Sequence, residues 1–267
     1  MDTPANHPLD TSLPARLRSG QPLHGIFNSV PSPAIVEMCA YAGFDFIVID
    51  NEHGSADLQT TEHMLRAARA AGIAPIVRCF EQDIPRVLDM GASGVQVPMV
   101  ETAEQAARLA ARLRYPLPPG RAGLSGTRGS AFSGRAAGYG FFGGPAHTAR
   151  SNEGLVFVAM VETPLGVANA AAIAAVPGVD AVFVGPNDLA HTMGFENRWQ
   201  EAPVQQAIEQ TVRAVAAAGK CPGVLALDAD VQRRYAAWGA RYFATVTTGL
   251  IVRALREARG AAAAISY

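Results

Sequence analysis

The segment FIVIDNEHGS, residues 46–55, starts with four apolar residues and then becomes polar without a break. A short apolar run of this kind is typical of a strand buried on both faces of a parallel sheet. Asp50, Asn51, Glu52 and His53 come directly after it. The segment therefore predicts a buried strand whose carboxyl end carries acidic and imidazole side chains.

Seven similar runs surround this segment and alternate with Ala-rich stretches of helical character. Asp57 and Gly72 bracket one expected helix, and two more are expected over residues 101–115 and 201–219. Eight strands alternating with helices over about 250 residues predict a (β/α)₈ TIM barrel. An open doubly wound sheet is the rival, although no GxGxxG sequence follows the first strand. The expected strands cover residues 24–28, 44–50, 74–78, 94–98, 155–162, 180–185, 223–227 and 241–246.

The chain is expected to form one catalytic barrel domain over residues 21–267, preceded by an N-terminal arm over residues 1–20. The arm contains three prolines and little apolar periodicity, which predicts a loosely held segment with at most one short helix. Residues 116–152 are Gly-rich, which predicts a long irregular surface loop. No GK[ST] sequence follows these glycines, so a P-loop is not expected.

The charge balance and the cysteines narrow the class of protein. Lys plus Arg number 22 and Asp plus Glu number 23, so no basic excess points to nucleic acid or to an anionic membrane. The first ten residues lack the features of a signal peptide, and no apolar run approaches the roughly 20 residues of a membrane span. Cys39, Cys79 and Cys221 stand alone within apolar segments and are expected to be buried free thiols. A cytoplasmic protein is predicted.

Polar residues follow four of the expected strands at the end where barrel enzymes carry their reactive side chains. His53 follows the second strand, Arg78 ends the third, Glu162 ends the fifth, and Asp188 lies just beyond the sixth. Two carboxylates from neighbouring strands, with the other positions left to water and substrate, suit Mg²⁺ or Mn²⁺ better than a structural zinc. These positions predict metal-assisted chemistry at the barrel mouth.

Each of these residues also has a structural interpretation. A carboxylate at a strand end is often a solvated residue or a helix cap, and His53 is also a candidate cap of the next helix. A buried Arg78 needs an anionic partner, which Asp50 or Glu52 would supply. The only lysine, Lys220, precedes the seventh strand, so no Schiff-base lysine is expected at a strand end.

Five segments closely resemble, in order and separation, the HpcH/HpaI family of class II, metal-dependent pyruvate aldolases. The resemblance extends over about residues 20–255. It implies a homohexamer with a C-terminal helix exchanged between subunits, and Mg²⁺, Mn²⁺ or Co²⁺ as cofactor. It also implies cleavage or formation of 4-hydroxy-2-oxo acids, from pyruvate or a related 2-oxo acid and an aldehyde, through a metal-bound enolate. The segments are FDFIVIDNEHG (44–54), PIVR (75–78), VLDMGASGVQVPMVETAEQA (87–106), VET (161–163) and GVDAVFVGPNDLA (178–190).

The resemblance also implies a role for individual residues. Glu162 and Asp188 correspond to the two metal ligands. His53 corresponds to the acid–base histidine, Arg78 to the arginine that orients pyruvate and stabilises its enolate, and Asp89 to the aspartate that raises the basicity of the histidine. Leu124 and Leu225 correspond to positions on the aldehyde side. The other substrate contacts are expected at Arg78, Met160, Gly185, Pro186, Asn187 and Asp188.

Two positions depart from the family pattern. The family usually has Gln two residues before the metal-binding Glu, where this chain has Met160, which predicts an altered preference for the 2-oxo acid. The loop usually reads Gly-x-Arg-Gly, and residues 120–123 read GRAG, with Arg121 shifted by one place and Ala122 at the arginine position. This second departure predicts an altered preference for the aldehyde.

The position of Asp89 raises a question about assembly. Asp89 precedes the fourth expected strand, whereas His53 follows the second, so the two lie at opposite ends of strands that span roughly 17 Å. If they form a dyad, Asp89 is expected to come from a neighbouring subunit. The alternative is that Asp89 caps the preceding helix or pairs with Arg86.

Two other functions remain open on the sequence alone. A CoA-thioester lyase of the citrate-lyase β-subunit type shares the barrel and the metal chemistry, although no basic groove for the CoA phosphates is evident. A catalytically inactive barrel that binds a 2-oxo acid is the second alternative. The presence of His53, Arg78, Glu162 and Asp188 together favours the aldolase.

Overall fold

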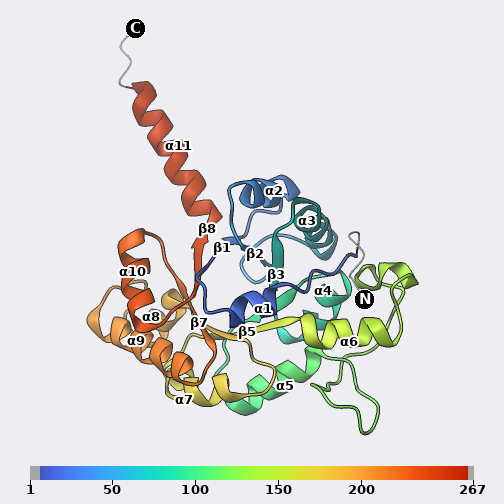
Figure 1. Cartoon of the computed structure of the whole chain (residues 1–267). Coiled ribbons are helices and arrows are strands. Elements are labelled where there is room, and N and C mark those ends of the chain that lie inside the picture. The colour runs from blue at the N-terminus through green and yellow to red at the C-terminus, as the bar shows by residue number, and fades with distance from the viewer. Residues whose placement is uncertain (1–6, 264–267) are drawn as a thin grey trace.

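The computed structural model describes residues 7–263 and contains eight parallel strands that close into one barrel in the order β1 to β8 (Figure 1). Strand β8 pairs with β1 to complete the closure, with Leu23 opposite Tyr242. The predicted (β/α)₈ barrel is confirmed, and the open doubly wound sheet is excluded. The strands are β1 (Leu23–Asn28), β2 (Phe46–Asp50), β3 (Ala74–Arg78), β4 (Gly94–Val97), β5 (Val156–Val161), β6 (Ala181–Val184), β7 (Cys221–Leu225) and β8 (Tyr242–Val246).

Helices surround the barrel, and their ends follow local sequence signals. The Asp57 carboxylate accepts a hydrogen bond of 2.7 Å from the Thr60 amide at the start of α3, and Gly72 ends this helix with φ of 80°. The helices are α1 (Leu13–Arg18), α2 (Pro33–Tyr41), α3 (Leu58–Ala71), η1 (Glu81–Asp83), α4 (Ile84–Asp89), α5 (Ala103–Leu113), η2 (Arg135–Gly140), α6 (Pro145–Gly154), α7 (Pro164–Ala175), α8 (Pro186–Thr192), α9 (Ala202–Ala217), α10 (Ala229–Trp238) and α11 (Thr247–Ala263).

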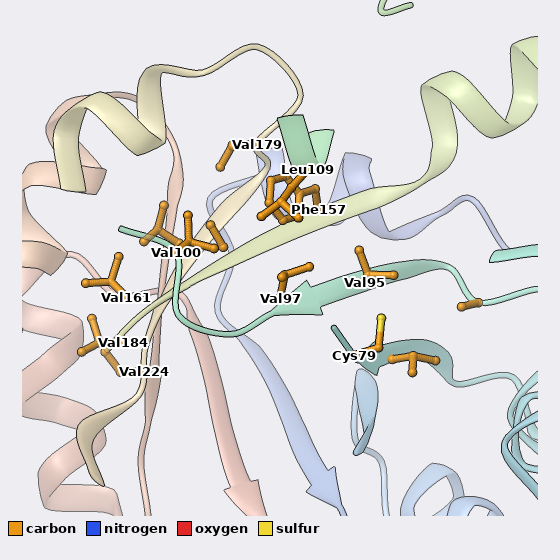
Figure 2. Packing of buried hydrophobic residues seen from close by; sticks show 14 of the residues in the cluster. Cys79, Val95, Val97, Val100, Leu109, Phe157, Val161, Val179, Val184 and Val224 are labelled. Carbon is orange, nitrogen blue, oxygen red and sulfur yellow. The ribbon is translucent and has the colours of Figure 1, made fainter. Parts of the chain in front are cut away.

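The core has two layers, as expected for strands that are apolar on both faces. The outer layer packs the barrel against the helices, and Figure 2 shows Leu109 of α5 beside Phe157 of β5, whose register partner on β4 is Val95. The inner layer fills the barrel, where the rings of Phe46 and Tyr242 stack at 4.2 Å. The barrel interior is therefore a packed core and leaves its mouth as the place for a site.

The N-terminal arm differs from its predicted description. Leu13 and Leu17 of α1 are buried and belong to the same cluster as the side chains inside the barrel. The Arg16 guanidinium donates a hydrogen bond of 3.1 Å to the Asp45 carbonyl oxygen at the start of β2. The described part of the arm is thus packed against the amino-terminal end of the barrel, and the prediction of a loosely held segment is wrong there. Residues 1–6 lie outside the described residues.

The long stretch over residues 116–152 is irregular only in part. Helix α6 begins at Pro145 and ends at Gly154, and it buries polar residues, namely His147, Ser151 and Asn152. The Asn152 amide donates to the carbonyl oxygens of Tyr115 and Leu124 at 2.9 and 3.1 Å. The prediction of a fully irregular loop is therefore wrong, and hydrogen bonds join α6 to the chain that follows α5 and to the loop at Leu124.

Helix α11 projects away from the barrel (Figure 1). Its side chains include Val252, which is 46% exposed, and Leu255, which is 64% exposed. The three cysteines are free and buried, as predicted. Among residues 7–263, no helix combines the length and the apolar character that a membrane span requires.

Candidate active site

A cavity of about 380 Å³ opens at the carboxyl ends of the strands. One part of its wall is apolar and is formed by Phe27, Met160, Phe183, Leu225 and Val246. The polar part is formed by Ser29, Asp50, His53, Arg78, Glu162, Asn187, Asp188 and His191, with the Gly185–Pro186 backbone. Most of the predicted site residues therefore line one cavity at the predicted end of the barrel.

Arg78 is held by a two-fold interaction with Asp50. The two residues are register partners on β2 and β3, so their side chains leave neighbouring strands side by side. Arg78 Nε donates to Asp50 Oδ1 at 2.8 Å, and Nη2 donates to Oδ2 at 2.6 Å. Phe27 lies beneath the guanidinium at 5.0 Å. Burial alone would raise the pKa of Asp50, but its bonds to Arg78 lower it overall, so both groups are charged.

Asp50 also organises the turn that carries the imidazole. Its Oδ1 accepts hydrogen bonds from the backbone amides of Glu52, at 3.1 Å, and His53, at 3.2 Å. One carboxylate thereby fixes both the guanidinium and the start of the loop after β2. Asp50 was expected only as a possible partner of Arg78, and its role in the loop was missed.

Glu52 lies behind Arg78, and His53 stands at the mouth. Arg78 Nη1 is 3.2 Å from Glu52 Oε2, so both partners that were expected for the buried guanidinium are present together. Burial, with the charges of Asp50 and Asp188 added, raises the pKa of Glu52 despite this cation. The His53 side chain is 61% exposed, and its Nε2 is 3.8 Å from the Glu52 carboxylate. The imidazole is therefore free to meet a group that arrives from outside the subunit.

Glu162 and Asp188 form the acidic side of the cavity. Glu162, directly after β5, is 2% exposed, and burial raises its pKa to about 7, with the charge of Asp188 adding to the shift. Its Oε2 accepts a hydrogen bond of 2.9 Å from the amide of Met99, a residue with a left-handed φ of 55°. Asp188 lies in the first turn of α8. A buried carboxylate beside a second one is stabilised in its charged form by a bound cation.

The donor set fits a hard divalent cation. Among the described residues, no group of three or more His, Cys, Asp or Glu side chains surrounds a common point, which disfavours a closed zinc site. Two carboxylates with room for other oxygen ligands suit Mg²⁺ or Mn²⁺. Gly185 has no side chain, and this absence makes room for the Glu162 carboxylate. A Cβ at position 185 would lie 2.2 Å from Glu162 Oε1.

Asp89 and Leu124 do not line this cavity. Asp89 ends α4, and its carboxylate accepts a hydrogen bond of 2.5 Å from Nη2 of Arg128, whose side chain is fully buried. Arg86 is instead 3.7 Å from Asp83, so the alternative pairing of Asp89 with Arg86 is wrong. Asp89 remains 31% exposed and is available at the surface to a second chain.

The interpretation of the GRAG sequence at residues 120–123 is also wrong. A Gly-x-Arg-Gly sequence occurs intact a few residues later, at residues 126–129. Arg121 is exposed, whereas Arg128 is buried and lies over the Tyr115 ring at 4.5 Å. The arginine of the pattern is therefore present in this chain, as Arg128. The Met160 side chain lines the cavity.

Two polar residues of the cavity were not expected. Ser29 follows β1, and His191 lies in the last turn of α8. A signal for His191 was present, because it follows Asp188 by three residues on a helix and so shares its face. No comparable signal marked Ser29.

The chain is similar to known proteins over nearly its whole length. Residues 23–254 match a family model described as HpcH/HpaI aldolase/citrate lyase. The chain is 39% identical over 261 residues to a hydroxypyruvate/pyruvate aldolase of Delftia acidovorans, covering 97% of this chain and 91% of the relative. It is 38% identical over 234 residues to a 5-keto-4-deoxy-D-glucarate aldolase of Salmonella paratyphi C, covering 86% and 88%. A crystal structure of an HpcH/HpaI aldolase/citrate lyase family protein from Burkholderia cenocepacia matches with a TM-score of 0.89 and 32% identity, covering 96% of this chain and 100% of that chain.

Proposed function

Because the chain belongs to the HpcH/HpaI aldolase/citrate lyase family, we propose that it is a metal-dependent aldolase of class II. It cleaves or forms 4-hydroxy-2-oxo acids, with pyruvate or a related 2-oxo acid as one product and an aldehyde as the other. The observation that carries the proposal is the shared cavity, which an anchored guanidinium lines together with the buried Glu162 carboxylate and the half-buried Asp188 carboxylate. That cavity offers both a metal site and a fixed positive charge.

Glu162 and Asp188 hold the divalent cation in this proposal, as Mg²⁺, Mn²⁺ or Co²⁺. When bound, the cation supplies Lewis-acid polarisation of the 2-oxo carbonyl group. Glu162 is buried and anchored by the Met99 amide, so one ligand is fixed before the cation arrives. Asp188 at the start of α8 completes the pair. The Gly185–Asn187 backbone beside them borders the space for the 2-oxo acid.

Arg78 stabilises the enolate that forms when the C3–C4 bond breaks. Its pairing with Asp50 fixes the guanidinium, so its remaining donors do not have to reorient as charge develops. Removing one such fixed donor typically lowers kcat by about 10²–10³-fold. Asp50 is a positioning residue in this scheme, since it acts through Arg78.

His53 moves the proton of the 4-hydroxyl group, a step that contributes about 10²–10⁴-fold. Its exposed imidazole has room for a partner, and Asp89 of a neighbouring subunit supplies that partner in our proposal. Assembly as a homohexamer, with α11 exchanged between subunits, accounts for the exposed apolar side chains of that helix. Each active site is then complete only in the oligomer. We place this oligomer in the cytoplasm.

Met160 and Leu225 set the preference for substrates. Met160 offers a thioether where the family usually offers an amide, so the 2-oxo acid loses one hydrogen-bond donor on that side. We expect hydroxypyruvate to be accepted as well as pyruvate, since its additional hydroxyl group provides another polar contact. Leu225 lies on the aldehyde side, and Leu124 reaches the cavity only if a second subunit brings it there.

A CoA-thioester lyase is less well supported. Arg78 is the only lysine or arginine that lines the cavity among the described residues, and Asp50 and Glu52 already balance its charge. The phosphates of CoA would find no free cation there. An inactive binding barrel is equally disfavoured, because it has no need for a buried guanidinium fixed on two carboxylates.

The decisive experiment measures α-proton exchange of pyruvate in D₂O, and aldol addition to glycolaldehyde, without CoA. Both activities should vanish after treatment with EDTA and return with Mn²⁺, whereas Glu162→Ala should not recover at the same Mn²⁺ concentration. Full activity in EDTA, with the metal content measured as nil, would refute the proposal. Mixing inactive His53→Ala and Asp89→Ala proteins under subunit exchange tests the shared site. Activity above both parents is expected, and its absence despite proven exchange contradicts the assignment of Asp89.

A further inference from the structure

Arg128 has a fully buried side chain although it carries a positive charge. Its Nη2 donates a hydrogen bond of 2.5 Å to Asp89 Oδ1, and its guanidinium lies over the Tyr115 ring at 4.5 Å. Its Nε and Nη1 are also buried, and they make no hydrogen bond within residues 7–263. A guanidinium that leaves water for a single hydrogen-bonded partner costs free energy, so stability does not account for this residue.

The backbone around Arg128 fixes the position from which its side chain starts. The amides of Thr127 and Arg128 donate to the carbonyl oxygens of Ala111 and Arg114, at the end of α5, at 2.8 and 2.9 Å. Gly126 permits this close approach, because a Cβ there would lie 2.1 Å from the Ala111 carbonyl oxygen. The segment is thus held against α5, and Arg128 extends from a fixed backbone.

The chain beyond Arg128 also contacts the end of α4, where Asp89 lies. Gly134 is close to the Asp89 backbone, since a Cβ at this position would lie 3.3 Å from the Asp89 carbonyl oxygen. Arg135 Nη1 donates to the Met90 carbonyl oxygen at 2.7 Å. The loop therefore holds the Asp89 side chain through Arg128 and the neighbouring backbone through Arg135.

The Asp89 carboxylate has one oxygen left for a partner. Oδ1 is bonded to Arg128, whereas Oδ2 accepts no hydrogen bond in the part of the chain that the structure describes. The side chain is 31% exposed and does not line the cavity of its own subunit. Because one oxygen is anchored, the other is held in a fixed direction and stays available to a donor from a second chain.

We propose that Arg128 is a positioning residue of the aldolase, which fixes the Asp89 carboxylate so that Oδ2 accepts a hydrogen bond from the His53 imidazole of a neighbouring subunit. The inference rests on the proposed aldolase activity and on the shared site. The bond to Asp89 sets which of the two ring nitrogens of His53 carries the proton, and leaves the other free to move the 4-hydroxyl proton. Arg128 acts through Asp89 and touches no substrate.

The first test separates positioning from folding. In Arg128→Met, kcat for the aldol addition of pyruvate to glycolaldehyde should fall on the order of 10²-fold, the usual effect of displacing a reacting group by about 1 Å. KM for pyruvate should stay within about twofold, because Arg78 and the metal site are unchanged. Tm should change by less than about 4 °C, since Asp89 is partly exposed and is not left as a buried charge. Arg128→Lys, which keeps a cation near Asp89, should retain part of kcat.

The second test asks whether Arg128 acts only through Asp89. The double variant Asp89→Ala/Arg128→Met should have the same kcat as Asp89→Ala, because the second change then removes nothing more. Subunit exchange tests the same point. Arg128→Met mixed with His53→Ala should exceed both parents in activity, since a wild-type His53 then meets a wild-type Asp89 and Arg128. Arg128→Met mixed with Asp89→Ala should not, because no subunit carries both Asp89 and Arg128.

The matched control is Arg121→Met, because Arg121 is an exposed arginine of the same loop, and its kcat should equal that of the wild type. A wild-type kcat in Arg128→Met overturns the positioning role, and so does a double variant slower than Asp89→Ala or a loss of activity that only follows unfolding. Pyruvate α-proton exchange by the wild-type protein separates the two failures. If exchange is absent, the aldolase proposal fails, and if it is present while Arg128→Met turns over normally, only the positioning role fails.

Discussion

Gly185 offers the sharpest test of the metal site, because only space and not backbone conformation requires glycine there. Its φ of −87° is ordinary for any residue, and its position before α8 tolerates alanine. An added Cβ would however lie 2.2 Å from Glu162 Oε1 and within 2.9 Å of the carboxyl carbon. Gly185→Ala therefore displaces the Glu162 carboxylate and leaves the fold intact.

The size of the effect follows from the overlap. Contacts of a Cβ below 3.0 Å are essentially never found, so a carboxylate at 2.2 Å must retreat by about 1 Å. Misplacing a reacting or binding group by about 1 Å costs on the order of 10²-fold in rate. Stability should change little, since replacing Gly by Ala before a helix costs at most about 1 kcal/mol, or about 2–4 °C in Tm for a chain of this size.

The assay combines Mn²⁺ affinity, followed by the electron paramagnetic resonance signal of free Mn²⁺, with aldol turnover. We expect a Kd for Mn²⁺ at least tenfold higher and a kcat/KM about 100-fold lower. Gly219→Ala, before β7 at the opposite end of the barrel, is the control for Mn²⁺ affinity and turnover, because a Cβ there meets nothing within 4 Å. If Gly185→Ala bound Mn²⁺ and turned over like the control, Glu162 would not be a metal ligand.

Three further predictions test the supporting structure. Asp50→Asn keeps the shape of the side chain but removes the charge that fixes Arg78, so kcat in an aldol assay should fall about 100-fold. Asp45→Asn, at the other end of the barrel, is the control, and its kcat should stay near that of the wild type. Burial lowers the pKa of His147 to about 4, so its neutral form contributes stability above pH 6.5 that is lost as the pH falls towards 4. His147→Gln removes this titration. The slope of the unfolding free energy against pH, measured by urea titrations near pH 5, should therefore fall by about 1.4 kcal/mol per pH unit. Deleting residues 247–267 should lower the oligomeric state measured by light scattering, and an unchanged mass would contradict the exchange of α11.

The fold was predictable because each strand has a run of apolar residues and each of three helices has clear end signals. Every expected strand overlaps an observed one. The arm was misjudged because three prolines obscured a real periodicity, in which Leu9, Leu13 and Leu17 recur every fourth residue and are all buried. Helix α6 was missed for the opposite reason, since it buries polar side chains and so has no apolar stripe.

The site was predictable to the extent that strand ends define it. Placing polar residues at the carboxyl ends of β3 and β5 leads directly to Arg78 and Glu162. Contacts that depend on the tertiary path of a loop could not be predicted from strand ends. The segment over residues 120–129 contains two similar Gly-Arg patterns. Only GTRG at residues 126–129 matches Gly-x-Arg-Gly, which the sequence already shows, whereas the exposure of Arg121 and the burial of Arg128 depend on the path of the loop.

Asp50 shows why the sequence identified the candidate partners of Arg78 but not which of them fixes the guanidinium. Asp50 and Glu52 are both acidic residues next to one strand end, so composition makes them equivalent partners for a cation. The register of β2 against β3 decides between them, because it sets Asp50 directly opposite Arg78 and gives it both short hydrogen bonds. Glu52 is left to a single, longer contact behind the guanidinium. Shifting one of the two strands by one residue would turn its side chain to the other face of the sheet and separate Asp50 from Arg78, so the pairing that fixes Arg78 depends on the same strand packing that closes the barrel.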